Sequence, residues 1–293
     1  MTLSEALPHR LTRIRWEHWL NRGLLYLSVA IFLFVVLLPF YWIFLSSITP
    51  KYLMFSLPPR YFPLKITFDN YVNMTTNIPF YRYLVNSLIF ALASGAISVA
   101  CAFLASYALA RIKLRGSNLV FMFFIVSIAV PQIGTIVPLF EMFNQFGLVN
   151  KHSGLIILMS SLITPFTVWI MVPFVQQIPV EIEEAAKIDG ANVAQVLWNV
   201  VIPVMMPALA TMLIINFIIA WNELLYPLVF ANSVVTKTLS VGLVEMAVDP
   251  SMGAGRPWDL MSALSVTMIL PVLALVLFFQ RMIISGLTRG AVK

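Results

Sequence analysis

The polar side chains that could do chemistry in this chain are few, and most of them lie inside long apolar stretches. Glu223 is the only acid in its apolar region, and Trp221 and Tyr226 provide aromatic faces beside it. Polar groups in such stretches usually face the interior of a helix bundle or a water-filled path. They can hydrogen-bond a polar solute, so we expect a solute path among Gln132, Ser160, Ser161, Thr164, Asn216, Trp221, Asn222 and Glu223.

The same residues argue against an enzyme. His9 and His18 lie near the N-terminus, His152 lies alone at the edge of an apolar stretch, and Cys101 is the only cysteine. A catalytic site needs converging nucleophiles, bases or acids, and a disulfide or thiolate metal site needs more than one cysteine. We therefore expect no catalytic residue, no metal ligand and no bound cofactor in this chain.

One segment, 179–203, has a different character, because its first part carries four acids and one lysine. Pro179 is suited to start a helix whose first-turn acids complement the helix dipole, and Gly190 can end that helix in a left-handed conformation. Asn192 is suited to cap a second helix that runs through Trp198 towards Pro203. The pattern predicts a helix–turn–helix whose small residues would let another protein approach closely. The alternative is an amphipathic connector that binds no partner.

The elements that position these residues follow from composition and charge spacing. Of 293 residues 60% are hydrophobic and 10% charged, and the mean hydropathy is +0.93, whereas soluble domains carry about 25% charged residues. Charged residues are absent from six long runs, each able to cross a bilayer as a helix of about 20 residues. We predict an all-α membrane protein with six transmembrane helices at about 24–49, 84–110, 117–140, 153–177, 204–230 and 260–283.

Orientation follows from the basic residues in the loops. Eleven of the 18 Lys and Arg residues lie on the side of the termini, and the short turn 111–115 contributes three of them. Because cytoplasmic loops are enriched in Lys and Arg, we expect both termini and the 179–203 segment in the cytoplasm. The domains would be a cytoplasmic segment, 1–22, and a transmembrane domain, 23–293. Within the second predicted span, small residues recur every four positions and predict close helix packing: Ser94, Ser98, Ala102, Ser106 and Ala110.

The 179–203 segment resembles the EAA loop of ABC importer permeases, whose pattern is E-A-A-x3-G-x9-I-x-L-P. Glu184-Ala185-Ala186, Gly190 and Pro203 match in place, whereas Val200 and Ile202 are conservative departures. In that family the first helix of the loop docks in a cleft of a separate ATPase subunit. The resemblance therefore implies that the ATPase-coupling residues are Glu184, Ala185, Ala186, Gly190 and Pro203.

Further motifs resemble the carbohydrate branch of this family from about residue 82 to the end. They are Ile182 to Ala191 (IEEAAKIDGA), Asn86-Ser87-Leu88, Pro131-Gln132 with Pro138, Gly147-Leu148-Val149-Asn150, Trp221-Asn222-Glu223, Pro227-Leu228 and the tail Gly286 to Lys293. The resemblance implies a subunit of a bacterial inner-membrane importer that moves a sugar or oligosaccharide, acidic ones included, by alternating access. It also implies its partners: a second, different permease chain, two ABC ATPases that bind ATP and Mg, an extracytoplasmic solute-binding protein, and membrane lipids.

Two observations limit these expectations. The chain has no phosphate-binding GxxxxGK[ST] loop, and Gly253-Ala254-Gly255-Arg256-Pro257 fits an extracellular turn, so ATP would be bound only by the partners. No basic run with interleaved aromatics suggests nucleic acid. The alternative function is an ion-coupled secondary transporter, although such proteins often carry intramembrane acids, which are nearly absent here. The sequence leaves the sugar and the identities of the partner subunits open.

Overall fold

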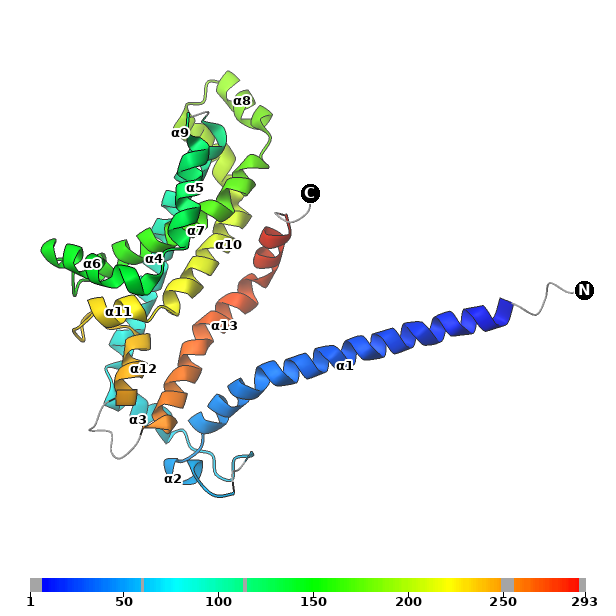
Figure 1. The fold of residues 1–293 in the computed structure, drawn as a ribbon, viewed down its shortest axis with the longest axis vertical. Helices are drawn as coiled ribbons and strands as arrows, with labels where there is room; N and C mark the ends of the chain where they lie inside the picture. The colour runs from blue at the N-terminus through cyan, green and yellow to red at the C-terminus, as the bar shows by residue number, and fades with distance from the viewer. Residues whose placement is uncertain (1–6, 59–60, 113–114, 249–255, 290–293) are drawn as a thin grey trace, which may run out of the picture. The chain divides into compact units, whose positions relative to one another are not determined.

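The computed structural model describes residues 7–58, 61–112, 115–248 and 256–289, and every regular element in these ranges is helical. The long helices (Figure 1) are α1 (Leu7–Ser47), α4 (Phe80–Arg111), α7 (His152–Gln176), α10 (Ile202–Trp221) and α13 (Trp258–Arg289). The shorter ones are α2 (Lys51–Met54), α3 (Asp69–Asn77), α5 (Ser117–Ile128), α6 (Gln132–Gln145), α8 (Val180–Ile188), α9 (Val193–Val196), the π-helical turn η1 (Leu197–Val201), α11 (Leu225–Phe230) and α12 (Leu239–Val248). The expected all-α class is confirmed.

Five helical stretches of the described residues are long and apolar enough to cross a membrane. They are Trp19–Ser47, Phe80–Arg111, His152–Gln176, Val193–Trp221 and Trp258–Gln280, with mean hydropathies from 2.2 to 2.6. A sixth is reached if α5 and α6 together form one bent span. The chain is therefore a multi-pass membrane protein, with five or six candidate spans among the residues that the structure describes.

The third expected span, 117–140, is not one straight helix. α5 ends at Ile128, and α6 begins at Gln132 after a bend of 101° (Figure 1). Pro131 stands between the two helices in an extended conformation, with φ −68° and ψ 128°. Proline has no backbone N–H and disfavours the helical conformation of the residue before it, so Pro131 favours the break between the two helices.

The fifth expected span, 204–230, also differs, because α10 ends at Trp221 and a separate short helix follows. Glu223 Oε1 accepts hydrogen bonds from the backbone N–H groups of Leu225, at 2.9 Å, and Tyr226, at 3.3 Å. These are N–H groups of the first turn of α11, which have no acceptor within a helix. The carboxylate therefore starts a new helix in place of the continuation of α10.

Long helix α1 has no break at residue 22, where the N-terminal segment was expected to give way to the first span. It runs as one helix from Leu7 through Ser47, and Pro39 lies inside it. Its C-terminal end is closed by Asn70, whose amide nitrogen donates to the carbonyls of Ser47 and Thr49, each at 2.9 Å. These contacts lie within the smaller of two compact units, Met1–Tyr71 with Trp258–Val266.

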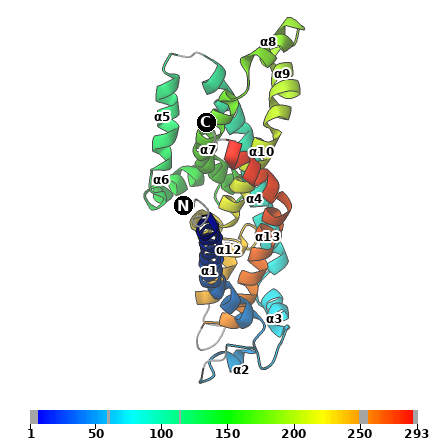
Figure 2. The same ribbon diagram turned by 90° about the vertical axis from the view of Figure 1, so that its right-hand side faces the viewer.

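The larger unit, Val72–Pro257 with Thr267–Lys293, is built on α4, α7 and α10, which lie side by side (Figure 2). The predicted small-residue face of α4 is confirmed as a packing face, because Ser94, Ser98, Ala102 and Ser106 are all fully buried. Small side chains let the backbones of two helices approach closely. Hydrogen bonds cross this face, from Ser160 Oγ of α7 to the Ser94 carbonyl, at 3.3 Å, and from Ser106 Oγ to the Val168 carbonyl, at 3.4 Å.

Candidate functional site

The predicted helix–turn–helix is present as α8 and α9. Glu181 and Glu183 lie in the first turn of α8, where acids complement the helix dipole. Gly190 follows the helix with φ +91°, and the N–H groups of Gly190 and Ala191 bond to the carbonyls of Lys187, at 3.0 Å, and Ala186, at 2.9 Å. This is the left-handed glycine end that the sequence predicted.

The predicted cap of the second helix is also confirmed. Asn192 Oδ1 accepts from the Gln195 N–H, at 2.9 Å, and the Gln195 side chain accepts from the Asn192 N–H, at 2.8 Å. This reciprocal pair satisfies two backbone donors that the start of a helix leaves open. The chain then runs through η1 into α10, and Pro203 lies near the first helical position of α10. Helices α9, η1 and α10 form one continuous helical stretch, Val193–Trp221.

Four of the five residues that match the family pattern are exposed, on α8, in the turn after it and at the start of α10. Glu184, Ala185, Gly190 and Pro203 are exposed, and Ala186 is half-buried against the apolar core of α4, α7 and α10. A side chain added at Gly190 would meet no atom within 4 Å. Ala185 and Gly190 are therefore small exposed residues at one end of the three-helix bundle (Figure 1), on a helix that also exposes Glu184 and the large apolar residue Ile188.

The residue that sequence reasoning missed is the neighbouring acid, Glu183, which is only 2% exposed. Its Oε2 accepts the Tyr107 hydroxyl, at 2.8 Å, and its Oε1 accepts Arg111 Nε, at 2.7 Å. Arg111 Nη2 also donates to the Ile178 carbonyl, at 2.6 Å. We name Tyr107, Arg111 and Glu183 the α4–α8 joint, because they tie the C-terminal end of α4 to α8 and to the residue before Pro179.

A helical pattern could have indicated this contact. Glu183 lies three residues before the half-buried Ala186, so both fall on one face of the helix, and a buried charge needs a partner. The identity of the partner could not be found in this way, because Arg111 lies 72 residues away in the chain.

Three of the proposed solute-path residues meet in the middle of the bundle. Asn216 of α10 is fully buried, and its amide nitrogen donates to Thr167 Oγ1, at 2.9 Å, and to Ser98 Oγ, at 3.2 Å. Thr164 Oγ1 donates to the Ser160 carbonyl, at 2.6 Å, and lies 3.2 Å from Ser98 Oγ. These bonds connect α4, α7 and α10, so in this conformation the side chains hold the helices together.

The other five solute-path residues lie apart from that cluster. Trp221 is buried, and its ring stacks on that of Phe217 with 5.5 Å between the ring centroids. Its Nε1 donates to the Met268 carbonyl, at 3.0 Å. Ser161 and Asn222 bond to carbonyls of their own helix, at 2.7 and 2.8 Å, and Glu223 starts α11. Gln132 is exposed at the start of α6. The structure therefore does not bring the eight residues together into one site.

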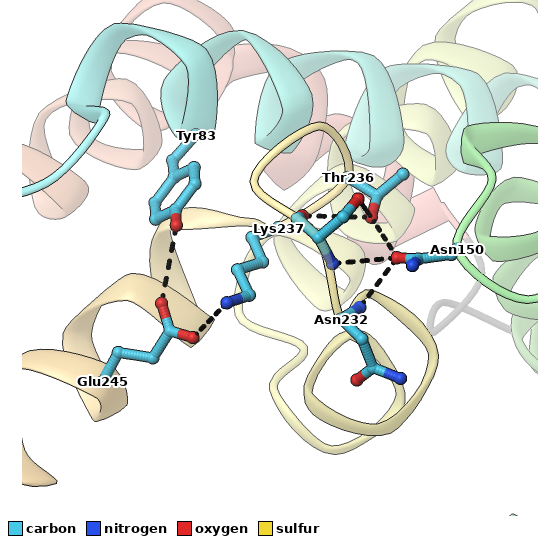
Figure 3. A network of polar contacts seen from close by, with 7 residues as sticks. Tyr83, Asn150, Asn232, Thr236, Lys237 and Glu245 are labelled. Atoms are coloured by element: carbon cyan, nitrogen blue, oxygen red, sulfur yellow. Dashed lines mark hydrogen bonds and ion pairs between the residues drawn. The ribbon is translucent and has the colours of Figure 1, made fainter.

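A second polar network holds the loop 231–239 at the opposite end of α4 (Figure 3). Asn150, with φ +64°, accepts at Oδ1 from the N–H groups of Asn232 and Ser233, at 2.8 and 2.9 Å, and from Thr236 Oγ1, at 2.9 Å. Lys237 pairs with Glu245, which also lies 3.5 Å from the Tyr83 hydroxyl (Figure 3). One amide oxygen thus organises three donors of this loop.

The start of α4 holds the same loop. Asn86 Nδ2 donates to the carbonyls of Val235 and Lys237, each at 2.9 Å, and its Oδ1 lies 2.9 Å from His152 Nε2. The Leu239 N–H donates to Ser87 Oγ, at 2.8 Å. Asn86-Ser87 and Asn150 entered the sequence analysis only as parts of family motifs, and the structure gives them a common role in fixing this loop.

Replacing Asn150 by alanine is expected to destabilise the chain by about 2 kcal/mol. The change removes an acceptor shared by three donors, and alanine tolerates the left-handed conformation of this position less well than asparagine does. Apparent melting temperatures of the detergent-purified chain would show a decrease on the order of 5 °C. Asn150→Asp keeps the acceptor oxygen and tolerates the left-handed conformation, so it should melt near the wild type. Equal melting of Asn150→Ala and wild type would contradict the assigned role.

Comparison with known proteins gives three kinds of match. Residues 102–289 match the family described as "Binding-protein-dependent transport system inner membrane component". The chain is 33% identical to the sulfoquinovosyl glycerol transport system permease protein SmoH of Agrobacterium fabrum, over 93% of this chain and 94% of that protein. It is 31% identical to the trehalose/maltose transport system permease protein MalG of Thermococcus litoralis, over 94% of this chain and 99% of that protein.

The fold also matches a solved structure. A chain of a bacterial ABC transporter involved in import of the acidic polysaccharide alginate superposes with a TM-score of 0.77, at 24% identity, over 91% of this chain and 96% of that chain. At 24% identity the match shows a similar fold and nothing about substrate or role. It supports the arrangement of helices described above.

Proposed function

The chain belongs to the family of binding-protein-dependent transport system inner membrane components, and we propose that it is the membrane-spanning permease subunit of an ATP-driven sugar or oligosaccharide importer. The observation that carries this proposal is that helix α8 is exposed on one side, at Glu184 and Ala185, and is bonded to α4 on the other side by a buried acid. A helix that only connected two spans would not need such a fastening.

The proposed ATPase-coupling surface is made of Glu184, Ala185, Ala186, Gly190 and Pro203. Support comes from their placement, because Glu184, Ala185 and Gly190 lie exposed around the turn that ends α8. In this proposal two ATPase subunits bind ATP and Mg, and their closure moves α8. The chain itself would hold no cofactor and catalyse no covalent step.

The substrate class is proposed from the curated relatives. SmoH and MalG are named for a sulfoquinovosyl glycerol and a trehalose/maltose transport system. A glycoside substrate, acidic ones included, is therefore the first class to test. An extracytoplasmic binding protein would deliver it, and a second, different permease chain would complete the path, with both termini of this chain in the cytoplasm of a bacterial inner-membrane complex.

The solute path is proposed to become accessible when the helices move. Ser160, Thr164 and Asn216 lie in the polar cluster between α4, α7 and α10, and polar groups in membrane helices commonly mark substrate pathways. The same proposal includes Gln132, Ser161, Trp221, Asn222 and Glu223 as path residues outside that cluster.

The test is purification of the tagged chain from native membranes in mild detergent, with every co-eluting subunit identified and counted. We expect an ABC ATPase at two copies and one other permease chain. Addition of the loaded binding protein to the reconstituted complex should stimulate ATP hydrolysis. If the chain elutes alone or only with itself after crosslinking, the proposal fails, and an ion-coupled transporter becomes the leading function.

A further inference from the structure

We propose that the α4–α8 joint transmits the movement of α8 to the membrane helices, so that Glu183 and Arg111 are positioning residues for coupling of hydrolysis to transport. This inference rests on the proposed function and assigns a role to residues outside the proposed docking surface. Glu184 faces outward, where an ATPase could contact it, whereas Glu183 faces inward.

The covalent connections of α8 are short non-helical segments. Residues 177–179 join it to α7, and residues 189–192 join it to α9. Short irregular segments can absorb a displacement by rotating their backbone dihedrals, so they transmit movement poorly. A second connection that bypasses them would carry the displacement of α8 directly into a transmembrane helix.

The α4–α8 joint is such a connection. Both oxygens of the Glu183 carboxylate are used, one by Tyr107 and one by Arg111, which lie four residues apart on one face of α4. The Arg111 guanidinium also donates, from Nη2, to the Ile178 carbonyl in the segment before α8. Charge-assisted hydrogen bonds of this kind are short and directional, so the joint resists both pulling and sliding.

Stability alone does not explain this arrangement. Taking a carboxylate and a guanidinium out of water is costly, and apolar residues of similar size often replace a buried ion pair without loss of stability. The Glu183 side chain is 2% exposed and that of Arg111 13%. The hydrogen bonds of this buried ion pair fix the relative orientation of α4 and α8, which an apolar contact would not do.

The helix that receives the movement is fastened to its neighbours. Ser98 of α4 bonds to Thr164 and Thr167 of α7 and to Asn216 of α10, and the α4 face around it is packed against α7. A displacement at the Arg111 end of α4 is therefore shared by three helices. The start of α4 bonds to the loop 231–239 through Asn86 and Ser87. Helix α4 therefore connects the α4–α8 joint to the opposite end of the bundle (Figure 1).

The test compares transport and ATP hydrolysis of the complete complex reconstituted in proteoliposomes with loaded binding protein. Glu183→Gln keeps the shape and an acceptor for Tyr107 but removes the charge that pairs with Arg111. Arg111→Lys keeps the charge but cannot reach both acceptors. For both variants we expect the ATPase subunits to co-purify and the amount transported per ATP hydrolysed to fall at least tenfold. Glu141→Gln, which removes an exposed carboxylate of α6, serves as control and should keep the wild-type ratio.

The double variant Arg111→Met with Glu183→Met separates coupling from folding. It should melt at a higher temperature than Glu183→Met alone, because no buried charge is left unpaired, and yet leave the ratio of transport to hydrolysis low. A wild-type ratio in the folded double variant, or in Glu183→Gln, would overturn the inference while the importer function stands. If the wild-type complex contains no ATPase, the proposed function and this inference fail together.

Discussion

Replacing Gly154 by alanine is expected to lower the apparent melting temperature of the purified chain by on the order of 10 °C. A Cβ at this position would lie 2.0 Å from the Leu148 carbonyl oxygen and 2.9 Å from its carbon, which are backbone atoms. Overpacking of this kind costs about 3 kcal/mol or more when the neighbour cannot move.

Leu148 cannot easily move, because hydrogen bonds hold its turn on both sides. Its own N–H bonds to the Phe143 carbonyl, at 2.8 Å, and the Asn150 N–H bonds to the Phe230 carbonyl, at 2.9 Å. A shift of the turn would therefore also disturb the Asn150 network that holds the loop 231–239. We expect Gly154→Ala to accumulate poorly in membranes and to elute partly aggregated in size-exclusion chromatography.

The matched control is Gly134→Ala, in the helix α6. The nearest atom to a Cβ at Gly134 is Pro131 Cγ, at 3.9 Å, which is an ordinary van der Waals distance. Alanine is the better helix former by up to about 1 kcal/mol, so this variant should melt at or above the wild-type temperature. If Gly154→Ala and Gly134→Ala behave alike, the close approach of Leu148 to α7 is not a constraint in the folded protein.

Replacing Gly190 by valine is expected to reduce the recovery of ATPase subunits with the tagged chain on the order of tenfold. Nothing lies within 4 Å of a Cβ there, so the effect comes only from the backbone conformation, φ +91°. A left-handed conformation costs a residue with a Cβ roughly 1–2 kcal/mol, and β-branched residues are especially unsuited to it. We expect the last turn of α8 to open and the proposed docking surface to be lost.

Two variants show whether this effect is local to the docking surface. Gly190→Asn should retain the ATPase subunits, because asparagine tolerates the left-handed conformation. Gly147→Val introduces a similar strain at another open glycine with positive φ, +64°, outside the α8–α9 segment. It should lose some stability but keep the ATPase subunits. Full recovery of the ATPase with Gly190→Val would contradict the assigned docking surface.

Local signals explain what the sequence predicted well. The predicted span 84–110 lies within α4, and the small residues spaced four apart lie on its packing face. Pro179, Gly190 and Asn192 set the limits of α8 and the start of α9 as predicted. Each of these features depends on residues within one or two helical turns, where backbone geometry and side-chain spacing are nearly sufficient.

The two spans that differ from the prediction show the limit of hydropathy. An apolar run without charges is equally compatible with a straight helix and with two helices at a large angle, as in α5 and α6. Pro131 was visible in the sequence, but prolines also occur within continuous helices here, as Pro39 in α1 and Pro165 in α7 show. Whether a proline bends a helix or breaks it depends on the partners found by the freed backbone groups.

The sequence by itself determined the class of the protein, most of its spans, and the form of the helix–turn–helix, because hydrophobicity, capping and glycine geometry act over short distances. Tertiary structure decided which partners the buried polar residues bond to. Glu183 finds Arg111 at a separation of 72 residues, and Asn86 finds the Val235 carbonyl at 149. A buried polar group must be paired, but the chain alone does not say with which group, since that choice is made by the helices that pack together.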